Sequence, residues 1–252
     1  MKKLIVANWK MNPQSQKEAE IVFNGIVKIA KSSRNIDIIV CPPFPFLSIG
    51  KKIKIKIKNL MLGAQNASEE AEGAYTGEVS PKMLAGLGVK YVIVGHSERR
   101  ALGETDQTIN KKIINALKSK ISPILCIGES IRDAGGDYLS FIKQELHECL
   151  KSIPKAQISN IVVAYEPIWA IGENANREAT PEEFTEARIL IRKIISDLYD
   201  SKTAHSVMIL YGGSVHEDNA KEFMLNGGAD GLLVGRDSLS PKKFALIINA
   251  AK

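Results

Sequence analysis

The sequence has few of the residues that build disulfide frameworks or metal centres. Its three cysteines, Cys41, Cys126 and Cys149, are widely spaced and form no C-x-x-C motif. This spacing argues against a disulfide framework and favours a reducing compartment. The four histidines lack the spacing of metal ligands, and no acidic cluster accompanies them. We therefore expect no metal site, and we expect the cysteines to serve in packing.

Long apolar runs are also missing. No run is long enough to span a bilayer. The N-terminal run Leu4–Ala7 is too short for the hydrophobic part of a signal peptide, and the polar residues Asn8 and Lys10 come directly after it. The sequence therefore predicts a cytoplasmic protein with no membrane contact.

Aromatic residues make up only 6% of the chain, although its formal net charge is +6. The densest basic segment, Lys51–Lys58, largely alternates lysine with isoleucine, which predicts an extended amphipathic stretch with a solvated face. No aromatic residue interrupts this segment to stack against bases, so we do not expect nucleic-acid binding. The positive charge can still help to attract a small anion.

What the chain does contain is a regular alternation of two kinds of segment. Short apolar runs predict buried strands at Leu4–Ala7, Ile36–Cys41, Leu60–Ala64, Tyr91–Val94, Ile124–Ile127, Ile161–Tyr165, Val207–Tyr211 and Gly231–Val234. Amphipathic stretches predict helices at Gln16–Ala30, Asp106–Ser119, Tyr138–Ser152, Pro181–Tyr199 and Pro241–Ala251. Thr180, Pro181 and Glu183 form a helix-start signal, whereas the three prolines of Pro42–Pro45 make the second connection the poorest helix candidate.

About eight strand–helix units without a linker predict an α/β fold. We expect a closed (β/α)8 barrel, a TIM barrel, formed as a single domain by residues 1–252. The alternative is an open doubly wound sheet. It is disfavoured because no G-x-G-x-x-G follows the first strand.

Polar residues follow most of the predicted strands. In a parallel barrel all carboxyl ends lie on one face, so residues distant in sequence should meet at one site. These residues are Asn8 and Lys10, Gln65 and Asn66, Gly95–Arg100, Glu166, Gly212–Ser214, and Gly235 with Arg236.

Glu166 is a lone carboxylate at the end of a buried strand, and an unusually apolar loop, Ile168–Ile171, comes after it. Such a loop suits a lid that closes over the carboxylate and excludes water. Desolvation would raise the pKa of the carboxyl group and suit it to act as a general base. The alternative is structural, with Glu166 capping the next element and Trp169 packing on the surface.

Two further side chains are candidates for polarising a substrate. Lys10 supplies a cation between Trp9 and Met11, and the alternative is a surface lysine. His96 precedes a plausible first helical turn, and a helix N-terminus disfavours a protonated ring, which leaves a neutral hydrogen-bond donor. Its alternative is a histidine packed at the barrel rim. We expect Glu98 to form an ion-pair network with Arg99 and Arg100, and also to reach Lys10.

Glycines end the seventh and eighth predicted strands. The segment Gly212–Ser214 leaves backbone N–H groups available for a close anion contact. Phosphate groups commonly bind after strands seven and eight of such barrels. The sequence therefore predicts a phosphate position here.

Taken together, six segments resemble the signature motifs of the triosephosphate isomerase family, in the right order along the whole chain. They are Ala7–Asn12, Gly63–Asn66, Gly73–Glu78, Gly95–Arg100, Ala164–Gly172 and Tyr211–Val215. The resemblance implies interconversion of dihydroxyacetone phosphate and glyceraldehyde 3-phosphate, without cofactor or metal, in a cytoplasmic homodimer.

The resemblance also implies roles for single residues. Glu166 is expected to be the base, His96 the electrophile, and Lys10 with Asn8 the pair that polarises the substrate. The loop Gly73–Glu78 is expected to insert into the partner subunit beside Lys10, although it can also be read as a flexible surface loop. The phosphate is expected to be bound, mostly by backbone groups, at Asn8, Lys10, Gly172, Gly213, Ser214, Gly235 and Arg236.

The chain departs from the family pattern in two places. After Gly172 the family usually continues Thr-Gly-Lys, whereas residues 173–180 here are about two residues longer, which alters the hinge of the lid. The family often has Gly-Gly-Ala-Ser after the last strand, whereas this chain has Gly235-Arg236-Asp237-Ser238. The Arg236 side chain points outward or adds a cation to the phosphate site, and we expect it to point outward.

Three classes of function remain open at this stage. The first is an active isomerase, which the presence of Lys10, His96 and Glu166 favours. The second is a barrel that binds a phosphate ester without catalysis because its altered lid no longer closes productively. The third is a surface or scaffold role, which the basic charge permits.

Overall fold

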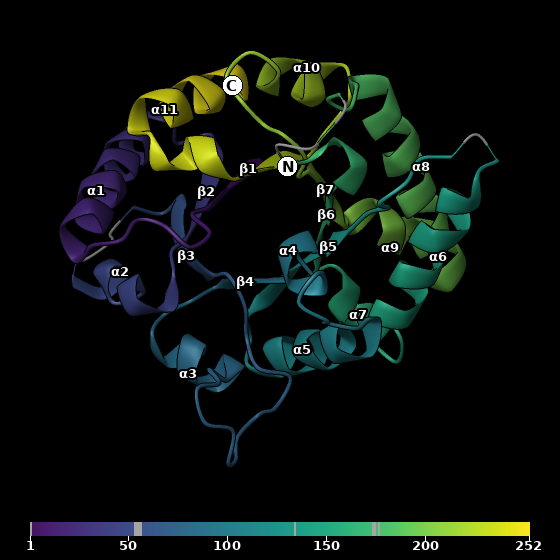
Figure 1. The fold of residues 1–252 in the computed structure, drawn as a ribbon, viewed down its shortest axis with the longest axis horizontal. Coiled ribbons are helices and arrows are strands. Elements are labelled where there is room, and N and C mark those ends of the chain that lie inside the picture. The colour runs from purple at the N-terminus through teal and green to yellow at the C-terminus, as the bar shows by residue number, and fades with distance from the viewer. Residues whose placement is uncertain (1, 53–56, 134, 173–174, 176) are drawn as a thin grey trace.

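Eight parallel strands close into a barrel at the centre of the molecule (Figure 1). The computed structural model describes residues 2–52, 57–133, 135–172, 175 and 177–252. Each strand pairs with the next in chain order, and β1 also pairs with β8. The closed (β/α)8 barrel is thus confirmed, and the open sheet is wrong. The strands are β1 Lys3–Asn8, β2 Ile36–Cys41, β3 Leu60–Ala64, β4 Tyr91–Val94, β5 Ser122–Ile127, β6 Val162–Tyr165, β7 Met208–Tyr211 and β8 Gly231–Val234.

Helices surround the strands on the outside (Figure 1). The α-helices are α1 Gln16–Ser32, α2 Ile49–Lys52, α3 Pro81–Gly86, α4 Ser97–Arg100, α5 Asp106–Lys118, α6 Asp137–Cys149, α7 Lys155–Ile158, α8 Pro181–Leu198, α9 Ser201–Ser206, α10 Ala220–Leu225 and α11 Pro241–Ala250. Three short 3-10 helices are η1 Phe44–Phe46, η2 Ile168–Ala170 and η3 Arg236–Leu239.

Helix starts are fixed by capping side chains. Thr180 accepts a hydrogen bond from the N–H of Glu183, while the Glu183 carboxylate accepts one from the N–H of Thr180, so the predicted start of α8 is a complete capping box. Ser15 caps α1 in a similar way by accepting from the N–H of Glu18. The start of α8 is therefore fixed at Thr180.

The core has two layers because side chains of a strand alternate between its two faces. Leu4 and Val6 point into the barrel with residues from the other strands, whereas Ile5 and Ala7 pack outward against the helices. Cys41 and Cys126 belong to the inner layer and Cys149 to the outer one. All three cysteines are buried free thiols, which confirms their predicted packing role.

The structure corrects one predicted segment. Lys51 and Lys52 end the short helix α2, so the prediction of an extended stretch is wrong at these two residues, and residues 53–56 lie outside the described part of the chain. The second connection otherwise contains only the short η1 and α2 in its described residues, as its prolines predicted.

Candidate active site

The predicted polar residues meet at the carboxyl ends of the strands. Most of them line two adjoining cavities of about 40 Å³ and about 680 Å³, which share Lys10, Ile171, Gly213 and Gly235. Gln65 and Asn66 line neither cavity: Gln65 donates to the carbonyl of Lys10, and Asn66 accepts from Lys112. The small cavity is also lined by Asn8, His96, Ser97, Glu166, Gly212 and Leu233. The large one extends over Gly172, Ser214 and Arg236. The structure therefore brings every predicted catalytic and phosphate-binding residue to one site.

Glu166 follows β6 and is almost completely buried, with a relative exposure of 2%. Its carboxylate accepts a hydrogen bond from the N–H of Ser97 at 2.9 Å. The other oxygen lies 3.1 Å from Nε2 of His96. Burial also raises the pKa of the Cys126 thiol well above its usual range, and the nearby Glu166 carboxylate adds to that shift. Glu166 is therefore a buried carboxylate held next to His96, which lines the same small cavity.

His96 follows β4 and is the N-cap residue of α4. Its Nδ1 accepts a hydrogen bond from the N–H of Glu98 at 3.2 Å. A ring nitrogen that accepts an N–H carries no proton, so the single ring proton lies on Nε2, which faces Glu166. This geometry is the neutral hydrogen-bond donor that the helix N-terminus predicted.

Lys10 has a left-handed backbone with φ of 53°, which is uncommon for a residue with a side chain. Its N–H donates to Asn8 Oδ1 at 3.1 Å, and its carbonyl accepts from Gln65 Nε2 at 2.9 Å. These contacts hold the backbone in place. They direct the ammonium group toward the cavity, where it also pairs with Glu98 at 2.7 Å.

The predicted ion pair of Glu98 with Lys10 is confirmed, but its predicted network with the two arginines is wrong. Arg99 pairs instead with Glu104. Arg100 pairs with Asp106 at 2.6 Å and with Glu145 at 3.3 Å. The reason is helical geometry, because neighbouring residues of a helix turn point in different directions.

The loops after β7 and β8 offer backbone donors to an anion. Among the described residues, no acceptor lies within hydrogen-bonding distance of the N–H groups of Gly213 and Ser214. A side chain at Gly213 would have its Cβ 2.3 Å from the hydroxyl oxygen of Tyr211, so only glycine fits there. Gly235 packs against Lys10, whose Cε would lie 3.3 Å from an added Cβ. Backbone donors and a cation thus surround one end of the cavity.

The apolar loop after Glu166 forms η2, and its Trp169 contacts both Glu129 and Arg177. Trp169 Nε1 and the hydroxyl of Tyr165 both donate to Glu129 Oε1, at 2.8 and 2.7 Å. The guanidinium of Arg177 lies over the Trp169 ring, 4.6 Å from its centroid. Ile171 lines both cavities. The longer segment after Gly172 falls partly on residues 173, 174 and 176, which lie outside the described part of the chain.

Sequence reasoning missed several residues that support the site. Ser97 and Gln65 were expected near the site but without a specific contact, and Gly128 and Glu129, which follow β5, were not considered. An added Cβ at Gly128 would lie 1.9 Å from the carbonyl oxygen of Glu166, so this glycine allows the end of β6 to approach the end of β5. Gly128 and Glu129 come directly after a predicted strand. The rule that residues after the strands of a parallel barrel meet at one face could therefore have identified them as well.

The structure shows neither a metal site nor a membrane span in its described part. Within the described residues, no group of histidine, cysteine and acidic side chains is placed to hold a metal ion. Over the same residues, no helix has both the length and the apolar character that crossing a bilayer requires.

Comparison with known proteins gives one consistent result. The family model described as "Triosephosphate isomerase" matches residues 3–251. The triosephosphate isomerase of Caldanaerobacter subterraneus subsp. tengcongensis is 42% identical to this chain over 249 residues, 98% of each chain. The proteins of the same name from Dictyoglomus thermophilum and Aquifex aeolicus are 41% and 43% identical over 251 residues. These matches cover 99% and 98% of this chain, and 99% of each relative.

Proposed function

The chain belongs to the triosephosphate isomerase family and interconverts dihydroxyacetone phosphate and glyceraldehyde 3-phosphate, and we propose that Glu166, His96 and Lys10 carry out this reaction. The observation that supports this assignment is the convergence of the three side chains on one small cavity. A base, a neutral donor and a cation are the groups that proton transfer next to a carbonyl requires.

Glu166 acts as the base. It removes a proton from the carbon next to the carbonyl, and the electron pair left behind forms the C=C bond of an enediolate. The protonated carboxyl group then returns the proton to the neighbouring carbon. His96 gives its Nε2 proton to the former carbonyl oxygen and takes up the proton of the neighbouring hydroxyl group, so that the ketone and the aldehyde exchange places. Both carboxylate oxygens have contacts to Ser97 or His96 in this structure, so Glu166 must turn from them toward the substrate.

His96 and Lys10 stabilise the negative charge that forms on the substrate oxygens. The Nε2–H of His96 donates to the carbonyl oxygen, and the Lys10 ammonium group lies beside that oxygen. Asn8 accepts a hydrogen bond from the backbone N–H of Lys10. Such donors are most effective where water is excluded, because charges interact more strongly at low dielectric. The lid of Ile168–Ile171 excludes water from the reacting atoms.

A coupled assay of the purified protein with glyceraldehyde 3-phosphate tests the proposal directly. We expect turnover that prior dialysis against a chelator leaves unchanged, because the roles above need no metal. Binding of triose phosphate without turnover would instead identify a phosphate-binding barrel.

The phosphate group binds to the backbone N–H groups of Gly172, Gly213, Ser214, Gly235 and Arg236. The Arg236 side chain is exposed at the rim of the larger cavity. We propose that it points away from the phosphate, which the backbone groups already bind.

Arg236→Gly should therefore change KM for glyceraldehyde 3-phosphate by less than about threefold, which is under ~1 kcal/mol. Steady-state kinetics at low ionic strength provide the measurement. A KM that rises tenfold or more at constant kcat would show that the guanidinium binds the phosphate directly.

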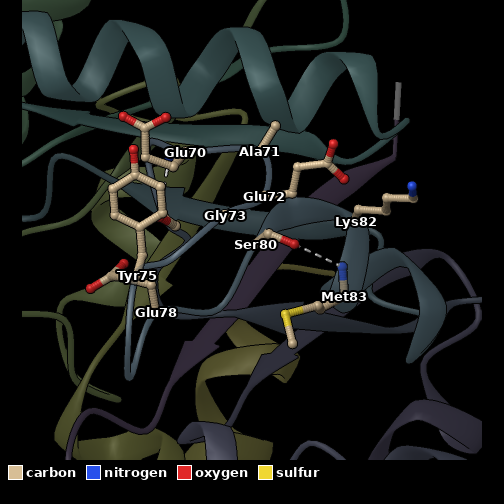
Figure 2. Close-up of a pocket in the computed structure, with 10 residues that line it drawn as sticks. Glu70, Ala71, Glu72, Gly73, Tyr75, Glu78, Ser80, Lys82 and Met83 are labelled. Atoms are coloured by element: carbon tan, nitrogen blue, oxygen red, sulfur yellow. Dashed lines mark hydrogen bonds between the residues drawn. The ribbon is translucent and has the colours of Figure 1, made fainter.

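We also propose a cytoplasmic homodimer. The segment between β3 and α3 projects away from the barrel (Figure 1). It encloses a cavity of about 540 Å³, and Figure 2 shows Tyr75 and Glu78 on one side of it and Lys82 and Met83 on the other. Met11, which follows β1, is 84% exposed. In a symmetric dimer each projecting loop would enclose Met11 of the partner subunit, beside Lys10.

Light scattering should therefore give a mass of twice the 27.6 kDa of one chain. Met11→Glu should weaken the dimer by more than about tenfold, because the interface would bury an unpaired charge. Leu225→Glu is the matched control, since Leu225 is also exposed but lies on α10. A monomeric mass with full activity would rule the dimer out.

A further inference from the structure

Cations gather at the amino ends of the strands, on the face opposite the active site. Exposed basic residues stand just before or at the start of five consecutive strands: Lys2 at β1, Arg34 at β2, Lys58 at β3, Lys90 at β4 and Lys120 at β5. The corresponding positions before β6, β7 and β8 include Asn160, Ser206 and Asp230 instead. Since neighbouring strands lie about 4.8 Å apart, these cations form a basic arc roughly 20 Å long.

The basic arc contains a cavity of about 680 Å³ at its β1–β3 end. Among the described residues that line it, Lys2, Lys31, Arg34 and Lys58 are cations, and the others are Ile57 and Asn59. No carboxylate is among these lining residues. The cavity is therefore concave and strongly positive, and nothing in the isomerase reaction uses it.

The contacts around the cavity leave its charge largely uncompensated. Lys2 pairs with Asp37 at 3.5 Å. Within the described residues, no carboxylate lies within 4.0 Å of the charged nitrogens of Lys31, Arg34 or Lys58. Three cations thus remain available to an anion.

Asn59 makes the floor of the cavity rigid. Its buried side-chain amide donates to the carbonyl groups of Ala30, Ser33 and Ile36, at 3.1, 2.9 and 2.9 Å. These carbonyls belong to the end of α1 and the turn into β2, where free carbonyl groups would otherwise repel an anion. Because Asn59 donates to them, these carbonyl groups are less exposed to an anion in the cavity.

We propose that this cavity binds a linear oligophosphate, such as inorganic polyphosphate or the triphosphate group of a nucleotide. Several closely spaced negative charges on one chain match several cations around one hollow. A chain that continues beyond the cavity would follow the arc toward Lys90 and Lys120. The described residues that line the cavity include no aromatic side chain to stack against a base, which favours phosphate recognition over nucleic-acid binding.

Calorimetric titration with inorganic tripolyphosphate tests the proposal, with orthophosphate, a longer polyphosphate and ATP as parallel arms. Salt near 0.1 M limits long-range charge effects to about 10 Å. We expect affinity to rise from orthophosphate to tripolyphosphate to the longer chain. Equal affinities of ATP and tripolyphosphate would identify the triphosphate group as the shared ligand, whereas much tighter binding of the longer chain would identify polyphosphate.

The triple variant Lys31→Gln/Arg34→Gln/Lys58→Gln should weaken tripolyphosphate binding by at least about tenfold while isomerase activity stays unchanged. The control Lys143→Gln/Lys221→Gln/Lys242→Gln removes the same charge from exposed positions on α6, α10 and α11, and should change affinity by less than about twofold.

Three outcomes would overturn the proposal. Equal losses in both variants would mean that net charge alone attracts the ligand. Displacement by saturating triose phosphate would place the ligand in the active site, some 20 Å away along β1. Tighter binding of single-stranded nucleic acid than of polyphosphate, lost in the triple variant, would identify a nucleic-acid surface instead.

Discussion

Replacing Glu166 with aspartate should lower kcat by about a hundredfold and leave KM for triose phosphate within about threefold. The shorter side chain places the carboxylate roughly 1 Å too far from the proton, and a displacement of that size can cost about 10² in rate. The backbone has little freedom to compensate. A Cβ added at Gly128 would lie 1.9 Å from the carbonyl oxygen of Glu166, and one added at Gly212 would lie 3.2 Å from Glu166 Cγ.

Steady-state kinetics of purified Glu166→Asp and of the control Glu186→Asp provide the test. Glu186 lies on α8 with an exposed side chain, so its shortening should not affect turnover. A Glu166→Asp variant that turned over like the wild type would mean that another group is the base.

His96→Asn should lower kcat by about 10² to 10³, because it removes the Nε2–H that stabilises charge on the substrate oxygen. The substitution is chosen to preserve the helix cap. Asparagine is among the best N-cap residues, and its side-chain oxygen can accept from the N–H of Glu98 as Nδ1 of His96 does now. The variant should therefore fold and melt like the wild type while losing activity.

The test compares both the kcat and the melting temperature of His96→Asn with those of the wild type. The control His147→Asn removes an exposed imidazole on α6 and should change neither. A His96→Asn enzyme with kcat within about threefold of the wild type would exclude the electrophilic role. Loss of both activity and stability would instead assign His96 a structural role in capping α4.

The barrel was predictable because its strands are short, buried on both faces and rich in apolar residues. The predicted runs Ile36–Cys41, Leu60–Ala64, Tyr91–Val94 and Gly231–Val234 match the observed strands residue for residue. The short helices α9 and α10 were not predicted, because six residues contain fewer than two helical turns and show little periodicity.

The candidate site also contains some residues that could be predicted from the sequence and others that could not. Lys10, His96 and Glu166 could be placed together because each follows a strand of a parallel barrel. The N–H of Ser97 that binds Glu166 could not be predicted, since any residue has an N–H and its direction depends on how β4 meets β6. Arg99 and Arg100 were paired wrongly, because Arg99 pairs with Glu104, and Arg100 pairs with Asp106 and with the distant Glu145.

The position of Trp169 gives the protein a built-in optical reporter. The chain has two tryptophans, and Trp9 is fully buried, whereas Trp169 lies on the loop after Glu166 between the Glu129 carboxylate and the Arg177 guanidinium. Charged groups this close to an indole shift its emission, so we expect movement of the loop to change the fluorescence of Trp169. Opening and closing of the proposed lid can therefore be followed by stopped-flow or temperature-jump fluorescence without an attached dye.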